Sequence, residues 1–324
     1  MSTNIRKKLT TDKSIEHMSE IIPNRLYFIT IKNKIPRDTK TTHFFSTDED
    51  SDTAQSLTLA KIANYLKQVN SKLSSPDLKS KAIVHFTSGS ELRRRNAVVC
   101  IGAYSIIYLG ATPTEAVEKL AGHTSSGLNR VLLTILHKAL QLGLVNFEDF
   151  NEDDFVNLDN IKLNWVIPRK FLMFFGPVSY VDGLHFPPKR YLEYFRQTGV
   201  KSIIRLSHLK YDANPFVDTS ICHYDLNMDR SVPSEQDLNC FLEICENTEG
   251  SVVIHNRDLL GRSGALIAAY LVKHYRLTAG EALAWVRLCS PDCVLEPQIS
   301  WITKNESSLR NAGDEYRRQQ LENA

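Results

Sequence analysis

Residues 252–283 read VVIHNRDLLGRSGALIAAYLVKHYRLTAGEAL, and the elements that this segment predicts indicate the fold class. It opens with a short apolar strand that ends at His255, passes through a polar loop and then predicts a helix. A Thr278-x-x-Glu281 box follows, in which the threonine caps the first turn of a second helix and the glutamate reaches back. The predicted unit is strand, loop, helix, capping turn, helix.

The same unit occurs once earlier in the chain. Residues 101–117, IGAYSIIYLGATPTEAV, align without gaps on residues 267–283, with six of seventeen positions identical. This copy also contains a Thr-x-x-Glu box, Thr112 to Glu115, and follows a short apolar strand that ends at His85. The matched caps and strands favour a tandem of related domains, and the alternative is two unrelated helical hairpins.

Strands and helices alternate through the second half of the chain. Residues 171–175 and 202–206 are predicted to be buried strands, with a helix over 187–196 between them. A helix over 234–247 begins with a Ser-x-x-Asp capping pattern and places Leu238, Phe241, Leu242 and Cys245 on one face. This alternation predicts an α/β fold in which each domain has a central, mostly parallel sheet flanked by helices.

The domain boundaries follow from the repeat and from an acidic segment between its copies. Residues 148–159 contain six acidic side chains and no lysine or arginine, which is typical of a solvated connector. The expected organisation is a flexible N-terminus, a first domain, an acidic linker, a second domain and a charged tail, over residues 1–20, 21–147, 148–162, 163–311 and 312–324.

Composition excludes several classes of protein. The 324 residues are 42% hydrophobic and 23% charged, with a formal net charge of +2, so nucleic-acid binding through bulk charge is not expected. The six cysteines form no CxxC pair, which argues against a zinc site, a thioredoxin-type site or a secreted disulfide framework. No apolar run reaches the roughly 20 residues that a membrane span needs. We therefore expect an intracellular protein, cytoplasmic or nuclear.

The loop HNRDLLGRSG, residues 255–264, has the features of an anion cradle. A loop that runs from a strand into a helix points successive backbone N–H groups at one spot, and the helix N-terminus adds a positive partial charge. Arg262 would supply a forked donor for a phosphate. We call residues 255–264 the signature loop.

The signature loop and the sequence after it resemble the signature region of the cell-division-cycle "fourteen" family of dual-specificity protein phosphatases. Similar stretches elsewhere include VHFTSGSELRRRNA from Val84, LNWVIPRKFLMFFGP from Leu163 and HYDLNMD from His223. The resemblance implies tandem dual-specificity-phosphatase-like domains, the first without a nucleophile. It also implies the loop pattern His-Cys-x5-Arg-Ser/Thr-Gly, and so a phosphatase site in the second domain.

The chain departs from that pattern at the centre of the site. The family's nucleophilic cysteine falls on Asn256, and no cysteine in the chain has an arginine six positions later. Asp258 and Leu259 stand where the family has Ala and Gly. The degenerate phosphate loop therefore comprises His255, Asn256, Arg257, Asp258, Leu259, Leu260, Gly261, Arg262 and Ser263.

Other positions implied by the resemblance lie outside the loop. Asp229 falls at the family's general-acid position, although an acid has no leaving group to protonate when no nucleophile attacks. Glu152, Asp153 and Asp154 are candidates for the acidic groove that selects basic peptides in the family. Arg93 to Arg95 are expected in a loop of the first domain, mainly as a solvated basic surface.

The favoured interpretation is a catalytically inactive phosphatase homologue that binds a protein partner, phosphorylated or not, in cell-cycle or cytoskeletal regulation. It needs no cofactor or metal, and it does not require nucleic acid or a membrane. One alternative is an active protein phosphatase that uses a non-standard nucleophile, such as water or Ser263. Another is a structural subunit of a larger assembly.

Overall fold

The structure is a computed structural model of the 324-residue chain. It describes residues 3–32, 34–47, 56–150, 157–158, 161–175, 189–206, 213–226, 228, 230–255, 261–291 and 293–323. The chain divides into two compact units, Met1–Lys138 and Ala139–Ala324, and the division falls within helix α5. Each unit is described by itself.

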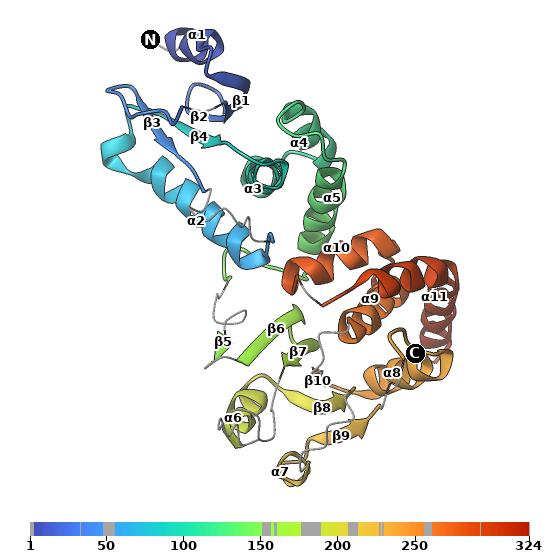
Figure 1. Cartoon of the computed structure of the whole chain (residues 1–324). Helices are drawn as coiled ribbons and strands as arrows, with labels where there is room; N and C mark the ends of the chain where they lie inside the picture. Colours follow the sequence, from blue (N-terminus) through green and yellow to red (C-terminus); the bar gives the residue numbers. More distant parts are fainter. Residues whose placement is uncertain are drawn as a thin grey trace. The chain divides into compact units, whose positions relative to one another are not determined.

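The first unit contains a four-stranded sheet in the order β1-β2-β4-β3 (Figure 1). Strand β4 pairs in parallel with both β2 and β3, whereas β1 pairs antiparallel with β2. The elements in chain order are α1 (Thr3–Thr11), β1 (Ile15–Ile22), β2 (Leu26–Ile31), β3 (Thr42–Phe45), α2 (Leu59–Ser74), the 3-10 helix η1 (Pro76–Leu78), β4 (Ala82–Thr87), α3 (Glu91–Leu109), α4 (Pro113–Lys119) and α5 (Leu128–Gln141).

The second unit contains a six-stranded sheet in the order β5-β6-β7-β10-β8-β9. Strand β10 pairs in parallel with β7 and β8, and β8 pairs in parallel with β9, while β6 pairs antiparallel with β5 and β7. Its elements are β5 (Asn157–Leu158), β6 (Ile161–Ile167), β7 (Phe171–Phe175), α6 (Lys189–Gln197), β8 (Val200–Arg205), α7 (Asn214–Val217), β9 (Cys222–Asp225), α8 (Glu235–Asn247), β10 (Ser251–His255), α9 (Arg262–Tyr275), α10 (Ala279–Cys289) and α11 (Glu296–Glu322).

Helices cover both faces of the second sheet because its central strands are apolar on both sides. In β7, Phe174 packs edge-on against Tyr191 and Phe195 of α6, whereas Phe171 contacts Phe241 of α8 and Tyr270 of α9. Successive side chains of a strand point to opposite faces, so these contacts place α6 on one face and α8 and α9 on the other. The grouping of α8 to α11 away from α6 is visible in Figure 1.

The predicted repeat is present in the structure as β4-α3-α4 and β10-α9-α10. Helix α4 begins at a capping box between Thr112 and Glu115, and α10 begins at one between Thr278 and Glu281. In each box the threonine hydroxyl accepts from the glutamate N–H while the carboxylate accepts from the threonine N–H. The predicted α/β fold is confirmed, with mixed sheets whose central strands are parallel.

The domain limits drawn from the sequence remain a prediction, but three segments carry more structure than that prediction assigned them. The expected flexible N-terminus, residues 1–20, includes helix α1 and most of β1, because β1 pairs antiparallel with β2. The expected linker, 148–162, includes β5 and the start of β6. The expected tail, 312–324, continues helix α11 through Glu322.

Candidate functional site

The candidate site lies where β10 ends and the signature loop begins. His255, the last residue of β10, is in register with Phe174 of β7 and Arg205 of β8, and Arg205 is in register with Asp225 of β9. Because these strands are parallel, their carboxyl ends meet at one edge of the sheet, the usual place for a ligand in an open α/β sheet. The loop therefore leaves the sheet from its middle, with β8 and β9 beside it.

The structure describes part of the predicted site. His255, Gly261, Arg262 and Ser263 are described. The other predicted site residues lie outside the described ranges: Asn256, Arg257, Asp258, Leu259, Leu260, Asp229, Glu152, Asp153 and Asp154. The assignments that rest on these residues remain predictions from the sequence.

His255 is a buried, neutral residue at the end of β10. Its side chain is among the least exposed polar groups of the chain, at 1%. Burial lowers the pKa of His255 to about 3, and the positive charge of Arg205 and the neighbouring His223 push it further in the same direction. His255 is therefore uncharged at neutral pH, and it would not add positive charge to an anion site.

Arg205 and Asp225 form a two-pronged ion pair beside His255. The Nε and Nη2 atoms of Arg205 each donate to one carboxylate oxygen of Asp225, at 2.6 Å in both cases. The pairing follows from the parallel register of β8 and β9, which sets the two residues side by side. Asp225 is thus a structural residue at the end of β9.

Arg205 is a site residue that the sequence analysis missed. A signal was present, because VKSIIR places a charged residue at the carboxyl end of an otherwise buried strand, and such a residue needs a partner. Arg205 is only 4% exposed.

Two glycines allow other segments to approach the start of α9 closely. Gly261 has φ +73°, and an added Cβ would lie 2.5 Å from Gln298 Oε1 and 2.8 Å from the Leu295 amide nitrogen. At Gly264 an added Cβ would overlap the Cys293 carbonyl oxygen. Glycine is therefore required at both positions, and the first turn of α9 is fixed against the segment that leads into α11.

Arg262 is directed at the protein's own backbone. It is 4% exposed, and its Nη1 donates to the carbonyl oxygen of Met228, the residue before Asp229. Gln298 of α11 holds the same region from another side, because its Nε2 donates to the Ser231 carbonyl while its Oε1 accepts from the Leu295 N–H. These bonds tie Met228 to the start of α9 and Ser231 to the start of α11. No local sequence pattern predicts the role of Gln298, since its partner Ser231 is 67 residues away.

Ser263, the proposed alternative nucleophile, is 1% exposed. Its hydroxyl has no hydrogen-bond partner among the residues that the structure describes. A serine needs a neighbouring base to become a nucleophile, and the described residues supply none within hydrogen-bond distance of this hydroxyl.

The first unit has an equivalent junction between β4 and α3. His85 is buried there, its Nδ1 lies 2.9 Å from the Tyr65 hydroxyl, and burial lowers its pKa to about 3. The expectation of a solvated loop for Arg93 to Arg95 is wrong, because all three residues belong to α3 and are partly buried. Arg94 pairs with Glu16 of β1 at 2.7 Å, and burial lowers the pKa of Arg95.

Cys100, Cys245 and Cys289 are among the chain's buried cysteines. Burial raises the pKa of the Cys100, Cys245 and Cys289 thiols, that of Cys100 to about 12, which disfavours the reactive thiolate. Within the described ranges, no group of three histidine, cysteine or acidic residues could hold a metal ion. No helix in the same ranges is long and apolar enough to cross a membrane.

Both halves of the chain match phosphatase families. Residues 20–129 match the family described as "Dual specificity protein phosphatase, N-terminal half", and residues 184–276 match "Polymorphic toxin system, DSP-PTPase phosphatase". The dual specificity protein phosphatase CDC14C of Homo sapiens is 37% identical over 325 residues, which cover 91% of this chain and 72% of that protein. This chain belongs to the CDC14 family. The implied tandem of phosphatase-like domains is thereby confirmed.

Other CDC14 proteins are similar over nearly the whole chain. CDC14AB of Danio rerio is 40% identical over 345 residues, 97% of this chain and 56% of that protein. The chain thus spans little more than half the length of that relative. Among solved structures, a putative protein tyrosine phosphatase from Leishmania major is 23% identical with a TM-score of 0.35, over 41% of this chain and 86% of that one.

Proposed function

We propose that this chain is a catalytically inactive member of the CDC14 family that acts by binding a protein partner. The observation that carries the proposal is Asn256, which occupies the position of the nucleophilic cysteine in the family's loop pattern. In that pattern a helix N-terminus and an arginine favour the thiolate form of the cysteine. An asparagine amide is neutral and has no nucleophilic form of comparable strength. Loss of a catalytic nucleophile typically lowers the rate by on the order of 10⁴ to 10⁶.

Two further substitutions oppose the binding of phosphate in the same loop. Leu259 adds a Cβ where the family's glycine lets the backbone curl around the anion. Asp258 adds a negative charge, which acts on the anion when the side chain faces the cradle and not when it points to solvent. In the first case a second charge about 4 to 5 Å away would be repelled by roughly 3 to 4 kcal/mol at an effective dielectric of 20. This repulsion equals or exceeds the roughly 1.5 to 3 kcal/mol of a charge-assisted bond from Arg262.

The contacts of Arg262 support the same proposal. One guanidinium nitrogen is engaged by the Met228 carbonyl, so part of the donor fork is directed at the protein's own backbone. Phosphate would compete with this carbonyl for the fork. The burial of Ser263 likewise argues against an active phosphatase that uses its hydroxyl as nucleophile.

Hydrolysis and binding measured on one preparation test the proposal. We expect no hydrolysis of p-nitrophenyl phosphate or of phosphopeptides above background. Arg262→Ala is the matched control for contamination. Turnover that persists unchanged in this variant comes from a contaminant, whereas turnover that disappears with Arg262→Ala would show that the loop is catalytic and would overturn the proposal.

The binding half of the proposal concerns partner chemistry. Because Asp258 opposes anions while Arg262 attracts them, we expect partners to be held mainly through unphosphorylated side chains. Phosphorylation should then change affinity by less than about tenfold, or roughly 1.4 kcal/mol. Affinity capture followed by calorimetry on matched phosphorylated and unphosphorylated peptides measures this. Much tighter binding of the phosphopeptide, lost with Arg262→Ala, would instead indicate a protein that shields phosphorylated sites.

The family also suggests where this binding takes place. The resemblance favours a role inside the cell, in the cytoplasm or nucleus, in cell-cycle or cytoskeletal regulation. Localisation of the tagged full chain tests this part of the proposal.

A further inference from the structure

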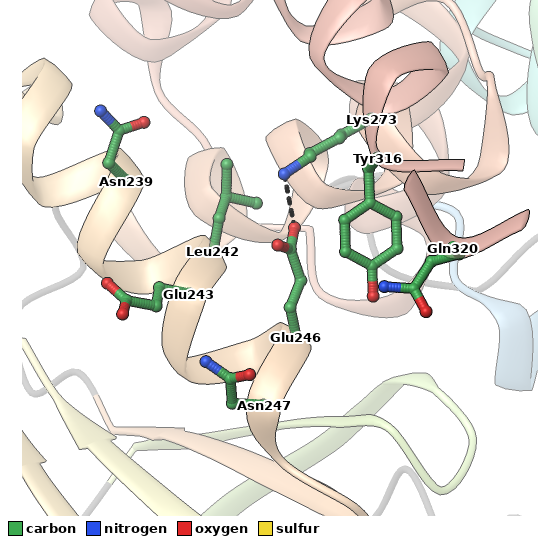
Figure 2. Close-up of a pocket in the computed structure, with 8 residues that line it drawn as sticks. All are labelled: Asn239, Leu242, Glu243, Glu246, Asn247, Lys273, Tyr316 and Gln320. Atoms are coloured by element: carbon green, nitrogen blue, oxygen red, sulfur yellow. Dashed lines mark hydrogen bonds and ion pairs between the residues drawn. The ribbon is translucent and has the colours of Figure 1, made fainter. Parts of the chain in front are cut away.

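A polar pocket of about 340 Å³ lies in the second unit between α8, α9 and α11 (Figure 2). Its lining residues are Asn239, Leu242, Glu243, Glu246, Asn247, Lys273, Tyr316 and Gln320. Lys273 belongs to the last turn of α9, whereas Arg262 begins that helix. Eleven residues of helix separate the two, about 16 Å along the axis, so the pocket is distinct from the signature loop.

In one wall of the pocket, the Glu246 carboxylate contacts both Lys273 and His274. Lys273 Nζ lies 2.6 Å from Glu246 Oε1, and His274 Nε2 lies 2.7 Å from the same oxygen. Lys273 also lies over the ring of Tyr316, 5.3 Å from its centroid. The ammonium group is thus held by Glu246 and Tyr316, and Figure 2 shows its side chain directed at Glu246.

The remaining charge in the pocket is negative. Glu243 is exposed, and it makes no ion pair with any residue in the described part of the chain. The lining therefore carries two carboxylates, Glu243 and Glu246, against the single ammonium of Lys273. Helix α8 as a whole has four acidic residues and no lysine or arginine. A cation in the pocket would offset the charge of Glu243.

The helices that form the pocket add to this negative potential. Glu243, Glu246 and Asn247 lie near the C-terminal end of α8, Lys273 near that of α9, and Gln320 near that of α11. The C-terminal end of a helix carries a partial negative charge of about half an electron. Lys170 and Arg317 cap backbone carbonyls of α8 and α9, but neither residue lines the pocket. Three helix ends and an uncompensated glutamate thus favour a positively charged occupant.

We propose that this pocket binds an arginine side chain from a basic segment of a partner protein. A guanidinium has five N–H donors in a plane. The Glu243 carboxylate and the amide oxygens of Asn239, Asn247 and Gln320 are acceptors on the lining. Tyr316 adds an aromatic side chain to the lining, and the Lys273 ammonium lies over one face of its ring. This proposal does not depend on the signature loop. The pocket would bind arginine whether that loop is catalytic or not.

A short arginine peptide tests the pocket directly. The probe is Ac-Ala-Ala-Arg-Ala-Ala-amide, and the matched control replaces arginine by citrulline, which has the same shape without the charge. In NMR titrations of the full chain we expect amide shifts confined to the C-terminal turns of α8, α9 and α11, with a Kd in the millimolar range. The citrulline peptide should bind at least about fivefold more weakly. Equal binding of the two peptides, or no shifts at these turns, overturns the proposal.

Two single substitutions in α8 distinguish binding in the pocket from general electrostatic attraction to the helix. Glu243→Gln removes the lining carboxylate that has no ion pair in the described part of the chain and should weaken the arginine peptide about fivefold. Glu235→Gln removes the same charge from an exposed position in the first turn of α8, outside the lining, and should leave the Kd within a factor of two of the unsubstituted chain. An equal loss in both variants would show nonspecific attraction and overturn the proposal.

Discussion

Asn256 is one of three substitutions that separate this signature loop from the CDC14 family pattern. The other two are Asp258 and Leu259. Gly261 and Gly264 hold the start of α9 closely against its neighbours. The chemical defect is therefore expected to be local to residues 256–259.

The first prediction at this scale concerns restoration of activity. Asn256→Cys alone should recover little phosphatase activity, because Asp258 and Leu259 still charge and distort the cradle. The triple change Asn256→Cys, Asp258→Ala, Leu259→Gly should give a rate at least about tenfold above the single change, since one removed repulsion of about 1.4 kcal/mol already corresponds to tenfold. Phosphopeptide turnover measures both. Full activity from Asn256→Cys alone would show that the cradle is intact.

The ion pair between Arg205 and Asp225 should contribute to the stability of the second unit. Asp225→Ala removes both acceptors of the buried Arg205 guanidinium and should lower the free energy of unfolding by about 1 to 3 kcal/mol, a range that allows for the partial exposure of Asp225. The control is Asp218→Ala, an exposed aspartate of the same unit, which should change it by less than about 0.5 kcal/mol. Urea denaturation followed by tryptophan fluorescence compares them. Equal losses would mean that the pair contributes no stability.

At the scale of helices and strands, sequence patterns predicted those elements whose signals are local. The boxes at Thr112, Ser234 and Thr278 cap helices as expected, because each box needs only four consecutive residues. The strand 171–175 is also confirmed, and a buried run needs no distant partner to be recognised. Strand β1 was missed because its half-exposed sequence is stabilised mainly by pairing with β2. His255 and Arg262 were predicted as site residues because both belong to one local motif. The roles of Arg205 and Gln298 depend on distant contacts, since Arg205 lies on a neighbouring strand and Gln298 bonds a residue 67 positions away.

The packing of α11 on α9 provides a prediction for whole elements. At Gly313 of α11 an added Cβ would overlap the Lys273 carbonyl oxygen, so the two helices touch at their backbones. Gly313→Ala should therefore destabilise the second unit by about 1 to 3 kcal/mol. Gly280→Ala in α10 is the matched control, since only Thr278 Oγ1 lies near, at 4.0 Å, and it should be neutral or stabilise by up to about 1 kcal/mol. An unchanged urea midpoint in Gly313→Ala would show that α11 can shift without cost.

At the scale of the whole molecule, each compact unit contains its own natural probe of unfolding. The three tryptophans, Trp165, Trp285 and Trp301, all belong to the second unit. Cys100 is the only cysteine of the first unit, and it is buried. Tryptophan fluorescence and thiol labelling of Cys100 therefore report on the two units separately within one sample.

Labelling of Cys100 tests how the stability of the first unit depends on pH. His85 and His123 of the first unit are buried with pKa values lowered to about 3, against an ordinary value of 6.5, so the unfolded chain binds more protons between those two pH values. The stability of the first unit should be intact above pH 6.5 and fall as the pH drops toward 3. In the double variant His85→Gln, His123→Gln the slope of stability against pH over this range should be shallower. Labelling of Cys100 by a disulfide reagent that reacts in acid, at graded urea concentrations, measures the slope. An unchanged slope would contradict neutral burial of these histidines.

Lys273 occupies an unusual position in the second unit, because its backbone carbonyl touches α11 while its ammonium is enclosed by Glu246 and Tyr316. At 8% exposure it is a buried lysine in a chain with many exposed ones. An acylating reagent added in brief pulses should therefore modify Lys273 far more slowly than the exposed Lys201, which belongs to the same unit. Detachment of α11 would uncover the amine. The acylation rate of Lys273, measured by mass spectrometry, thus reports the rate at which helix α11 detaches.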